Sequence, residues 1–194
     1  MKHRSSQILF DHWTEKRAGR LLPERSEIDP ASIRSALGDT FILAFNPLPE
    51  NPFRLAGTRI CALFGRELKG AAFAALWAED GSIDITRMVC AVADESVGVV
   101  ARAVGSSESG DSVDLELLLL PLSHCGQTHL RLIGTLAPLT VPYWLGLSPI
   151  TRLTLAEYRY VGHHGERSAS IVRLPPAESP RRRHGLVVYD GGQV

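Results

Sequence analysis

The 194-residue sequence predicts an α+β domain: a five-stranded antiparallel sheet with helices on one face, preceded by N-terminal helices. Two apolar runs of strand length, 41–45 and 53–56, flank a proline-rich connection and predict a hairpin. Apolar residues at helical spacing follow over 80–95. Further strand-like stretches then come in succession, with short turns that favour antiparallel pairing: 97–104, 113–121 and 128–136.

The N-terminal region predicts helices. Residues 5–18 carry apolar side chains at helical spacing, including Leu9 and Trp13. A second helix is expected from Asp29-Pro30 onward, because Asp caps a helix and Pro suits its first position. Helices placed ahead of a sheet in this way either dock against the domain or pair with a second copy.

Phe53–Gly70 predicts a strand, a glycine turn, a short helix and a glycine stop. Gly57 would permit a sharp change of direction, because a residue without Cβ tolerates positive φ. Thr58 can cap the helix that follows. Gly65 or Gly70 would then end it.

Composition divides the chain into three parts. Residues 1–38 form an N-terminal helical extension, 39–145 the sheet-containing core, and 146–194 an irregular, partly disordered tail. Within the tail, 150–160 could be a strand-like or an irregular segment. The Pro- and Arg-rich stretch 175–184 is typical of disorder.

Charge and cysteine content bound the class of protein. The 21 basic and 21 acidic residues balance, so no global charge attracts nucleic acid or an anionic membrane. We expect no signal peptide and no membrane span, because no apolar run approaches the ~20 residues that a span needs. Cys61, Cys90 and Cys125 are far apart and odd in number, which favours a reducing, cytoplasmic location over a disulfide framework.

No sequence motif is diagnostic of catalysis or metal binding. The chain has no phosphate loop, no Gly-x-Ser-x-Gly and no His-Glu-x-x-His. His163 and His164 are adjacent, so both imidazoles cannot face one way on a strand. Cys125 next to His124 supplies too few ligands for a metal. We therefore expect no enzyme activity and no metal site.

Aromatic and Met side chains between the sheet and its helices predict either a solid core or the lining of an apolar ligand cavity. Polar residues near them would orient a ligand. The full candidate set for such a cavity is Phe41, Arg59, Cys61, Phe64, Phe73, Trp77, Met88, His129 and Arg131.

Several motifs occur in a familiar order: a helix with Trp13, Leu22-Pro23-Glu24-Arg25-Ser26-Glu27-Ile28-Asp29-Pro30, Arg54–Thr58, and Leu63–Gly70. With them the chain resembles, over about residues 8–145, the PAS-like domain family of alphaproteobacteria, often small stand-alone proteins. The resemblance implies the order two strands, helices, three strands. It also implies a sensory or regulatory module that holds a ligand or none, because fold alone fixes no function.

The resemblance raises two possible cofactors, haem and flavin, and the sequence disfavours both. Haem in such domains usually has a helix His as its axial ligand, and the helix expected over 80–95 has none. Flavin photochemistry in the family uses a cysteine next to Arg-Phe-Leu. Cys61 lies in Arg59–Phe64 without the companion Asn and Gln residues. The cofactor, if one binds, is therefore unknown.

These observations favour a cytoplasmic sensory or regulatory module with no catalytic effector of its own. It would act through a small ligand, through protein contacts, or through both. Output would pass through the N-terminal helix and an exposed sheet face to a signalling partner protein. Homodimerisation is expected, with Leu9 and Trp13 forming the seam.

Two alternatives stay open. A small α+β-cone enzyme would use a cavity acid or base such as Asp94, Glu95 or His129, and it needs two titratable groups that converge. A nucleic-acid-associated factor would act through Arg181–Arg183. That reading is disfavoured, because so few charges give a weak and salt-sensitive contact.

Overall fold

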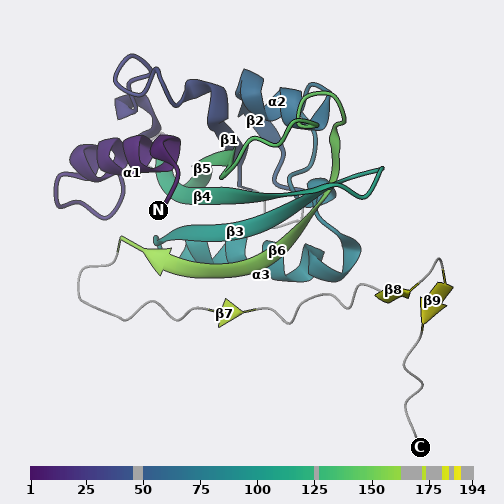
Figure 1. The fold of residues 1–194 in the computed structure, drawn as a ribbon. Coiled ribbons are helices and arrows are strands. Elements are labelled where there is room, and N and C mark those ends of the chain that lie inside the picture. Colours follow the sequence, from purple (N-terminus) through teal and green to yellow (C-terminus); the bar gives the residue numbers. More distant parts are fainter. Residues whose placement is uncertain (46–49, 125–126, 163–171, 174–180, 184–185, 189–194) are drawn as a thin grey trace, which may run out of the picture.

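An antiparallel sheet organises the chain in the computed structural model, which describes residues 1–45, 50–124, 127–162, 172–173, 181–183 and 186–188 (Figure 1). Seven strands lie in the order β2-β1-β5-β4-β3-β6-β7, and every neighbouring pair is antiparallel. The strands are β1 Thr40–Ala44, β2 Phe53–Ala56, β3 Gly98–Ser107, β4 Ser112–His124, β5 Gln127–Pro138, β6 Ile150–Val161 and β7 Val172–Arg173.

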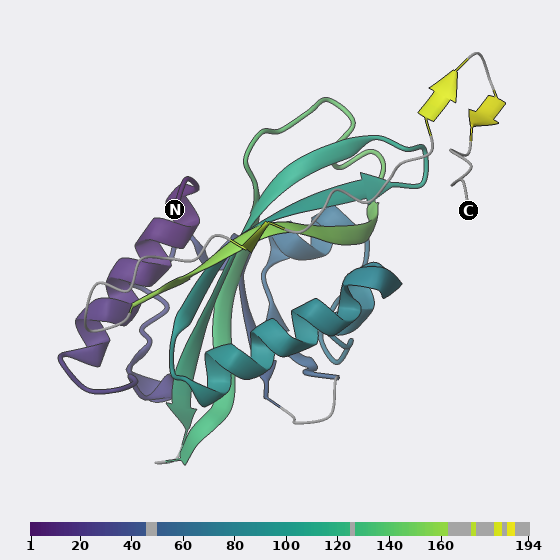
Figure 2. The same ribbon diagram turned by 90° about the horizontal axis from the view of Figure 1, so that it is seen from below.

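Helices cover both faces of this sheet. The α-helices are α1 Arg4–Arg17, α2 Thr58–Phe64 and α3 Glu79–Asp94, and the short 3-10 helices are η1 Arg25–Glu27, η2 Leu37–Asp39 and η3 Ala74–Leu76. Figure 2 shows three layers, with α1 on one side of the sheet and α2 and α3 on the other. The predicted α+β class is confirmed, but the helices lie on both faces of the sheet and not on one face as expected, because α1 covers the apolar outer face of β4 (Figure 2).

The sheet is larger than the predicted five strands, because Ile150–Val161 forms β6 along the edge of β3 and the short β7 pairs with β6. The sequence left this segment open between strand and irregular structure. Leu153 and Leu155 on β6 are buried in the interior core, which explains the pairing. An edge strand as long as β3 would otherwise present unpaired backbone groups.

Two apolar cores lie on opposite faces of β4. Leu115, Leu117 and Leu119 belong to the core under α2 and α3. Leu118 and Leu120 belong to the core under α1. The run of leucines breaks the alternation expected of a strand with one solvent-exposed face, because helices cover both faces of β4.

The second N-terminal helix is not formed as an α-helix. The Asp29 carboxylate does cap the segment, accepting from the backbone N–H of Ala31 and Ser32 at 3.0 and 3.2 Å. Residues 30–36 nevertheless make successive turns that end in η2. Helix nucleation is costly in so short a segment, and the Ser32 hydroxyl also bonds Asp29 at 2.7 Å.

Gly57 is needed for close packing rather than for positive φ. Its φ is −67°, and it is the N-cap of α2, so Thr58 does not cap the helix. A Cβ at Gly57 would lie 2.3 Å from the carbonyl oxygens of Leu37 and Gly38. Gly65, with φ of 62°, ends α2 in the left-handed conformation that the sequence predicted.

The expected tail is only partly described. Arg181–Arg183 forms β8, which pairs antiparallel with β9, Leu186–Val188, in a small separate sheet. The rest of the predicted disordered stretch and the His163-His164 pair lie outside the described residues. Among the described helices, none combines the length and apolar character required to span a bilayer.

Candidate functional site

The aromatic half of the predicted site does come together, in the core between the sheet and α3. Phe41 stacks on Phe73 with ring centroids 5.7 Å apart, and Phe53 meets both rings edge-on at 5.7 and 5.8 Å. Trp77 meets Phe73 edge-on at 5.8 Å. Phe64 and Met88 are buried in the same core. These contacts fill much of the interior with side chains.

Trp77 carries an unsatisfied polar atom in this core. Its indole Nε1 is buried and has no hydrogen-bond partner among the described residues. Leaving such a donor unpaired costs about 1–3 kcal/mol. The Trp77 N–H is therefore the group that an interior ligand with an acceptor atom would relieve.

The predicted polar residues do not surround that core. Arg59 lies at the surface, where its side chain pairs with Asp39. Arg131 shares the pleat position of Ile133, which packs in the core under α1, and so belongs to the opposite face of the sheet. The side chain of His129 lies outside the described part of the chain. Of the predicted polar residues whose side chains are described, only Cys61 packs against the interior core, at its half-buried margin.

The described thiols are not activated. Burial raises the pKa of Cys61, and the neighbouring Glu67 charge raises it further. Burial and the Asp94 charge also raise the pKa of Cys90. Both thiols are free and stay protonated at neutral pH, whereas a nucleophilic cysteine needs a lowered pKa.

The acids proposed for an enzyme do not meet in the interior either. Asp94 and Glu95 are exposed at the end of α3. Within the described residues, no group of three or more His, Cys, Asp or Glu side chains could hold a metal ion.

A buried carboxylate, Asp39, joins α1 to α2. Asp39 Oδ1 accepts from Arg59 Nε at 2.7 Å, and Oδ2 accepts from Arg59 Nη2 at 2.7 Å. Oδ2 also accepts from the Ser5 hydroxyl at 2.6 Å. Ser5 is in the first turn of α1, Asp39 ends η2, and Arg59 is in the first turn of α2. We call these three side chains the Asp39 node.

The surroundings of the Asp39 node reinforce it. Arg59 Nη2 also donates to the Ser35 carbonyl at 3.0 Å. Beside Ser5, the Ser6 hydroxyl bonds the buried Thr135 hydroxyl at 3.0 Å. The hydrogen bond to Asp39 raises the pKa of Arg59, although partial burial opposes this. Sequence patterns missed the node, because its members are distant in sequence and Arg59 was expected in the cavity.

Leu9 and Trp13, expected at a dimer seam, are both fully buried within the single chain. Trp13 Nε1 donates to the Pro121 carbonyl on β4 at 2.8 Å. Arg17 lies over the Trp13 ring, 5.1 Å from its centroid, and donates to the Gly162 carbonyl after β6 at 2.7 Å. In this conformation neither seam residue is available to a second copy.

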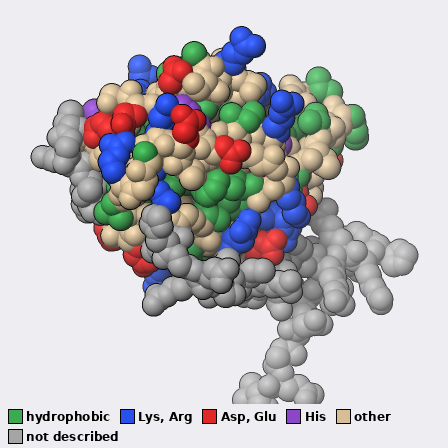
Figure 3. All heavy atoms as spheres, turned by 90° about the vertical axis from the view of Figure 1, so that its left-hand side faces the viewer, with side chains coloured by type: hydrophobic (Ala, Val, Ile, Leu, Met, Phe, Trp, Pro, Cys, Tyr) green, Lys and Arg blue, Asp and Glu red, His purple; other side chains and the backbone are tan. Residues whose placement is uncertain are grey.

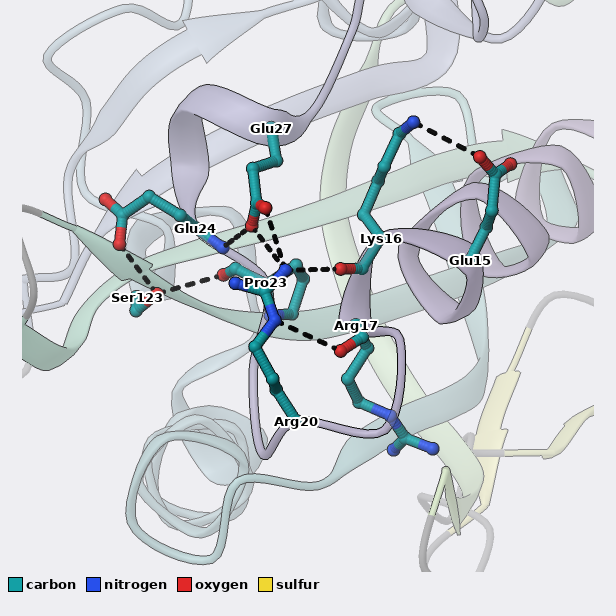
Figure 4. Close-up of polar contacts among 8 residues, drawn as sticks. All are labelled: Glu15, Lys16, Arg17, Arg20, Pro23, Glu24, Glu27 and Ser123. Atoms are coloured by element: carbon teal, nitrogen blue, oxygen red, sulfur yellow. Dashed lines mark hydrogen bonds and ion pairs between the residues drawn. The ribbon is translucent and has the colours of Figure 1, made fainter.

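The loop after α1 is also tied down, as Figure 4 shows. Arg20 Nη2 donates to the Lys16 carbonyl at 2.7 Å, which caps the helix end, and to both Glu27 oxygens at 2.8 and 2.9 Å. The hydrogen bond from Arg20 is the largest cause that lowers the pKa of Glu27. Ser123 donates to Glu24 at 2.8 Å and so joins the loop to β4.

The other end of α1 is held by Glu116 on β4. Its carboxylate is buried and accepts from the backbone N–H of Lys2 at 2.6 Å and of His3 at 3.0 Å. A carboxylate at this end also complements the helix dipole. The whole of α1 is therefore fixed to the outer face of the sheet at both ends and along its apolar stripe.

Strand order β2-β1-β5-β4-β3, with the helices inserted between β2 and β3, defines an α+β domain of the PAS type. A family model described as a PAS domain matches residues 1–137. The chain belongs to the PAS domain family, as the resemblance predicted. The matched region includes α1, so the N-terminal helix is part of what the family shares.

Solved structures resemble the chain more weakly. The PAS domain of a Colwellia psychrerythraea protein is 13% identical with a TM-score of 0.43, covering 57% of this chain and 97% of that one. An RNA-binding light-oxygen-voltage receptor is 19% identical with a TM-score of 0.46, covering 61% and 36%. A Rhodobacter sphaeroides light-oxygen-voltage protein is 15% identical with a TM-score of 0.43, covering 54% and 60%. No curated protein matches the chain.

Proposed function

We propose that this PAS domain is a cytoplasmic regulatory module without a catalytic effector of its own. It links the state of its interior to the position of α1, and α1 with the adjoining sheet face meets a signalling partner protein. The Asp39 node carries this proposal, because it connects a helix on the interior side of the sheet to a helix on the outer side.

The proposed coupling runs through short, charge-assisted bonds. A ligand that entered the interior would displace α2, which contributes Ile60, Leu63 and Phe64 to that core. Arg59 moves with α2 and shifts the Asp39 carboxylate. The hydrogen bond from Ser5 to Asp39 then passes this movement to α1. A ligand can shift such a module only if it binds one arrangement of the helices better than the other.

The interior has one feature that favours a ligand with an acceptor atom. Trp77 presents an indole N–H that has no partner among the described residues, and its ring packs edge-on against Phe73. A flat, largely apolar molecule with a carbonyl or ring nitrogen suits those contacts. Native mass spectrometry of protein from its own cells tests this point. Recovery of a stoichiometric small molecule supports a ligand, and its absence leaves protein contacts as the only input.

Hydrogen exchange tests the coupling. In Arg59→Gln, we expect amide exchange in α1 to accelerate about tenfold, because the buried Asp39 carboxylate loses its charged partner. Arg66→Gln is the matched control, since Arg66 is an exposed arginine close to α2 with no described side-chain bond. Exchange in the centre of α3 reports any global loss of stability.

Selective acceleration in α1, absent from Arg66→Gln and from α3, is the expected result. Equal exchange in α1 for the Arg59→Gln and native proteins would show that the node transmits nothing, and the proposed route would be withdrawn.

A further inference from the structure

A pocket of about 180 Å³ opens on the outer face of the sheet, beside the start of α1. Residues of β3, β4 and β6 line it, together with Met1 and Lys2, which precede α1. The sheet separates this pocket from the interior core that holds Trp77. Its volume corresponds to about six water molecules of the liquid, which suits a small molecule.

Part of the pocket lining is apolar. Val100 is buried in the core under α1, and Met1 packs against the same core. Leu139 also lines the pocket, and its backbone N–H is fixed by the Asp114 carbonyl at 2.8 Å. Figure 3 shows the molecule from the α1 side, where hydrophobic side chains gather with acidic and basic ones around them. The apolar part of a ligand would leave water on entering this pocket, which favours binding.

Most of the charged groups in the lining already have partners. The buried Glu116 carboxylate accepts from the two backbone N–H groups just before α1, at 2.6 and 3.0 Å. The Glu157 carboxylate accepts from Arg102 Nε at 3.3 Å. Arg102 Nη1 also donates to Asp114 at 3.1 Å. These three lining residues therefore have little capacity left for a ligand.

Arg159 differs from them. It lies on β6 directly opposite Val100 on β3, so its side chain shares the outer face of the sheet. Arg159 is half-buried, and within the described part of the chain it has no hydrogen bond or ion pair. A guanidinium can donate two parallel hydrogen bonds to one carboxylate, and such charge-assisted bonds are stronger than neutral ones. The unused polar group of this pocket is thus a donor suited to a carboxylate.

We propose that this pocket binds a small aliphatic carboxylate, with its carboxylate on Arg159 and its chain on the apolar part of the lining. The volume suits about eight non-hydrogen atoms, the size of hexanoate. The two acidic side chains of the lining disfavour a doubly charged group such as a phosphate, because like charges repel. An uncharged molecule would leave Arg159 without a partner, and a cationic molecule would be repelled by it.

This site gives the module an input that is separate from its interior. The inference goes beyond the proposed function, because it requires neither an interior ligand nor the Asp39 node. A bound carboxylate lies against Met1 and beside Glu116, which holds the start of α1. Opening of this end of α1 would also dismantle the site. Binding should therefore slow amide exchange at Lys2 and His3, by up to about tenfold at ten times the Kd.

A nitrogen-15 NMR titration of the 194-residue chain with hexanoate tests the proposal. A ligand of so few atoms should bind with a Kd of about 0.1–5 mM. Amide shifts should concentrate at Val100, Glu116 and Arg159, and should be absent from Val89 and Val92, which are buried in the interior core. Acetate, hexanol and hexylammonium should each bind at least tenfold more weakly, because each lacks the aliphatic chain or the carboxylate.

Substitutions of arginine test the proposed contact. In Arg159→Gln the Kd for hexanoate should rise at least tenfold, because the charged paired donor is lost. Arg159→Lys keeps the charge without the planar fork and should fall between Arg159→Gln and the native protein. Arg152→Gln is the matched control, since Arg152 is an exposed arginine of the same strand, outside the pocket and without a described side-chain bond. The amide spectrum of each variant reports whether it is folded.

Four results would overturn the proposal: no saturable shift up to about 50 mM hexanoate, shifts confined to the interior core, an unchanged Kd in Arg159→Gln, or equal binding of hexanol and hexanoate. None of them bears on the Asp39 node, because hydrogen exchange in Arg59→Gln is measured without any carboxylate. Failure of this site and failure of the proposed function are therefore distinguishable.

Discussion

At the scale of single residues, two glycines in similar local settings have different roles. Gly57 lies between β2 and α2 with an ordinary negative φ, but the chain from Leu37 to Gly38 passes directly against it. Gly81 lies in the first turn of α3 with open space around it. Local sequence shows only that both lack a Cβ. Whether a Cβ could be accommodated depends on the backbone packed against each glycine, which comes from distant positions in the sequence.

Gly57→Ala should therefore destabilise the protein by about 3 kcal/mol, because backbone oxygens cannot give way as a flexible side chain can. Gly81→Ala should stabilise it by up to about 1 kcal/mol, since Ala loses less entropy in a helix. Urea unfolding of both variants measures the two free energies. A neutral Gly57→Ala would show that the approach of Leu37 and Gly38 is looser than the structure has it.

At the scale of elements, α1 acts as part of the domain and not as an appendage. The sequence predicted the helix and its apolar stripe, but it assigned Leu9 and Trp13 on that stripe to a dimer seam. The stripe instead covers the outer face of β4 and β5, since Leu118, Leu120 and Ile133 would be exposed without α1.

Trp13 gives the sharpest test of this docking. Trp13→Ala should cost about 3–5 kcal/mol, because it leaves a large cavity. Trp13→Phe keeps most of the ring but leaves the Pro121 carbonyl without its 2.8 Å bond, so it should cost about 1–2 kcal/mol. Thermal and urea unfolding measure both. A loss below about 1 kcal/mol for Trp13→Ala would mean that α1 is not seated on the sheet.

At the scale of the whole molecule, local patterning predicted the order of elements well. Alternation and helical spacing located five strands, α1 and α3, because those signals are set by which face is buried. β6 was left undecided, since its alternation changes phase between Leu155 and Tyr158, where a bulge interrupts the pairing, and since the strand depends on the free edge of β3. The prediction of a second N-terminal helix was wrong, because a capping residue alone does not outweigh the free-energy cost of nucleating a helix.

The candidate site was predicted only in its apolar half. Phe41, Phe73 and Trp77 converge because a large aromatic side chain on a core-facing position is buried against its neighbours. Polar residues carry no such constraint. The Arg59 side chain forms an ion pair with the buried Asp39, and Arg131 lies on the other face of the sheet. The Asp39 node depends on three segments meeting at one edge, and no local pattern encodes such a meeting.

The strand β6 allows a test at this largest scale, because two truncations differ only in whether they keep it. A chain ending at residue 162 retains β6 and the Gly162 carbonyl that Arg17 contacts. A chain ending at residue 149 loses both, bares the edge of β3, and uncovers the interior core beside Leu153 and Leu155. Exposed edges of long apolar strands pair with other chains.

We therefore expect the chain ending at 162 to unfold at nearly the native urea midpoint and to remain soluble. The chain ending at 149 should lose more than about 3 kcal/mol, since it removes several buried side chains, and should aggregate on a sizing column. Equal stability of the two truncations would mean that β6 merely lies along the sheet. The domain would then end with β5, close to where the family match ends at residue 137.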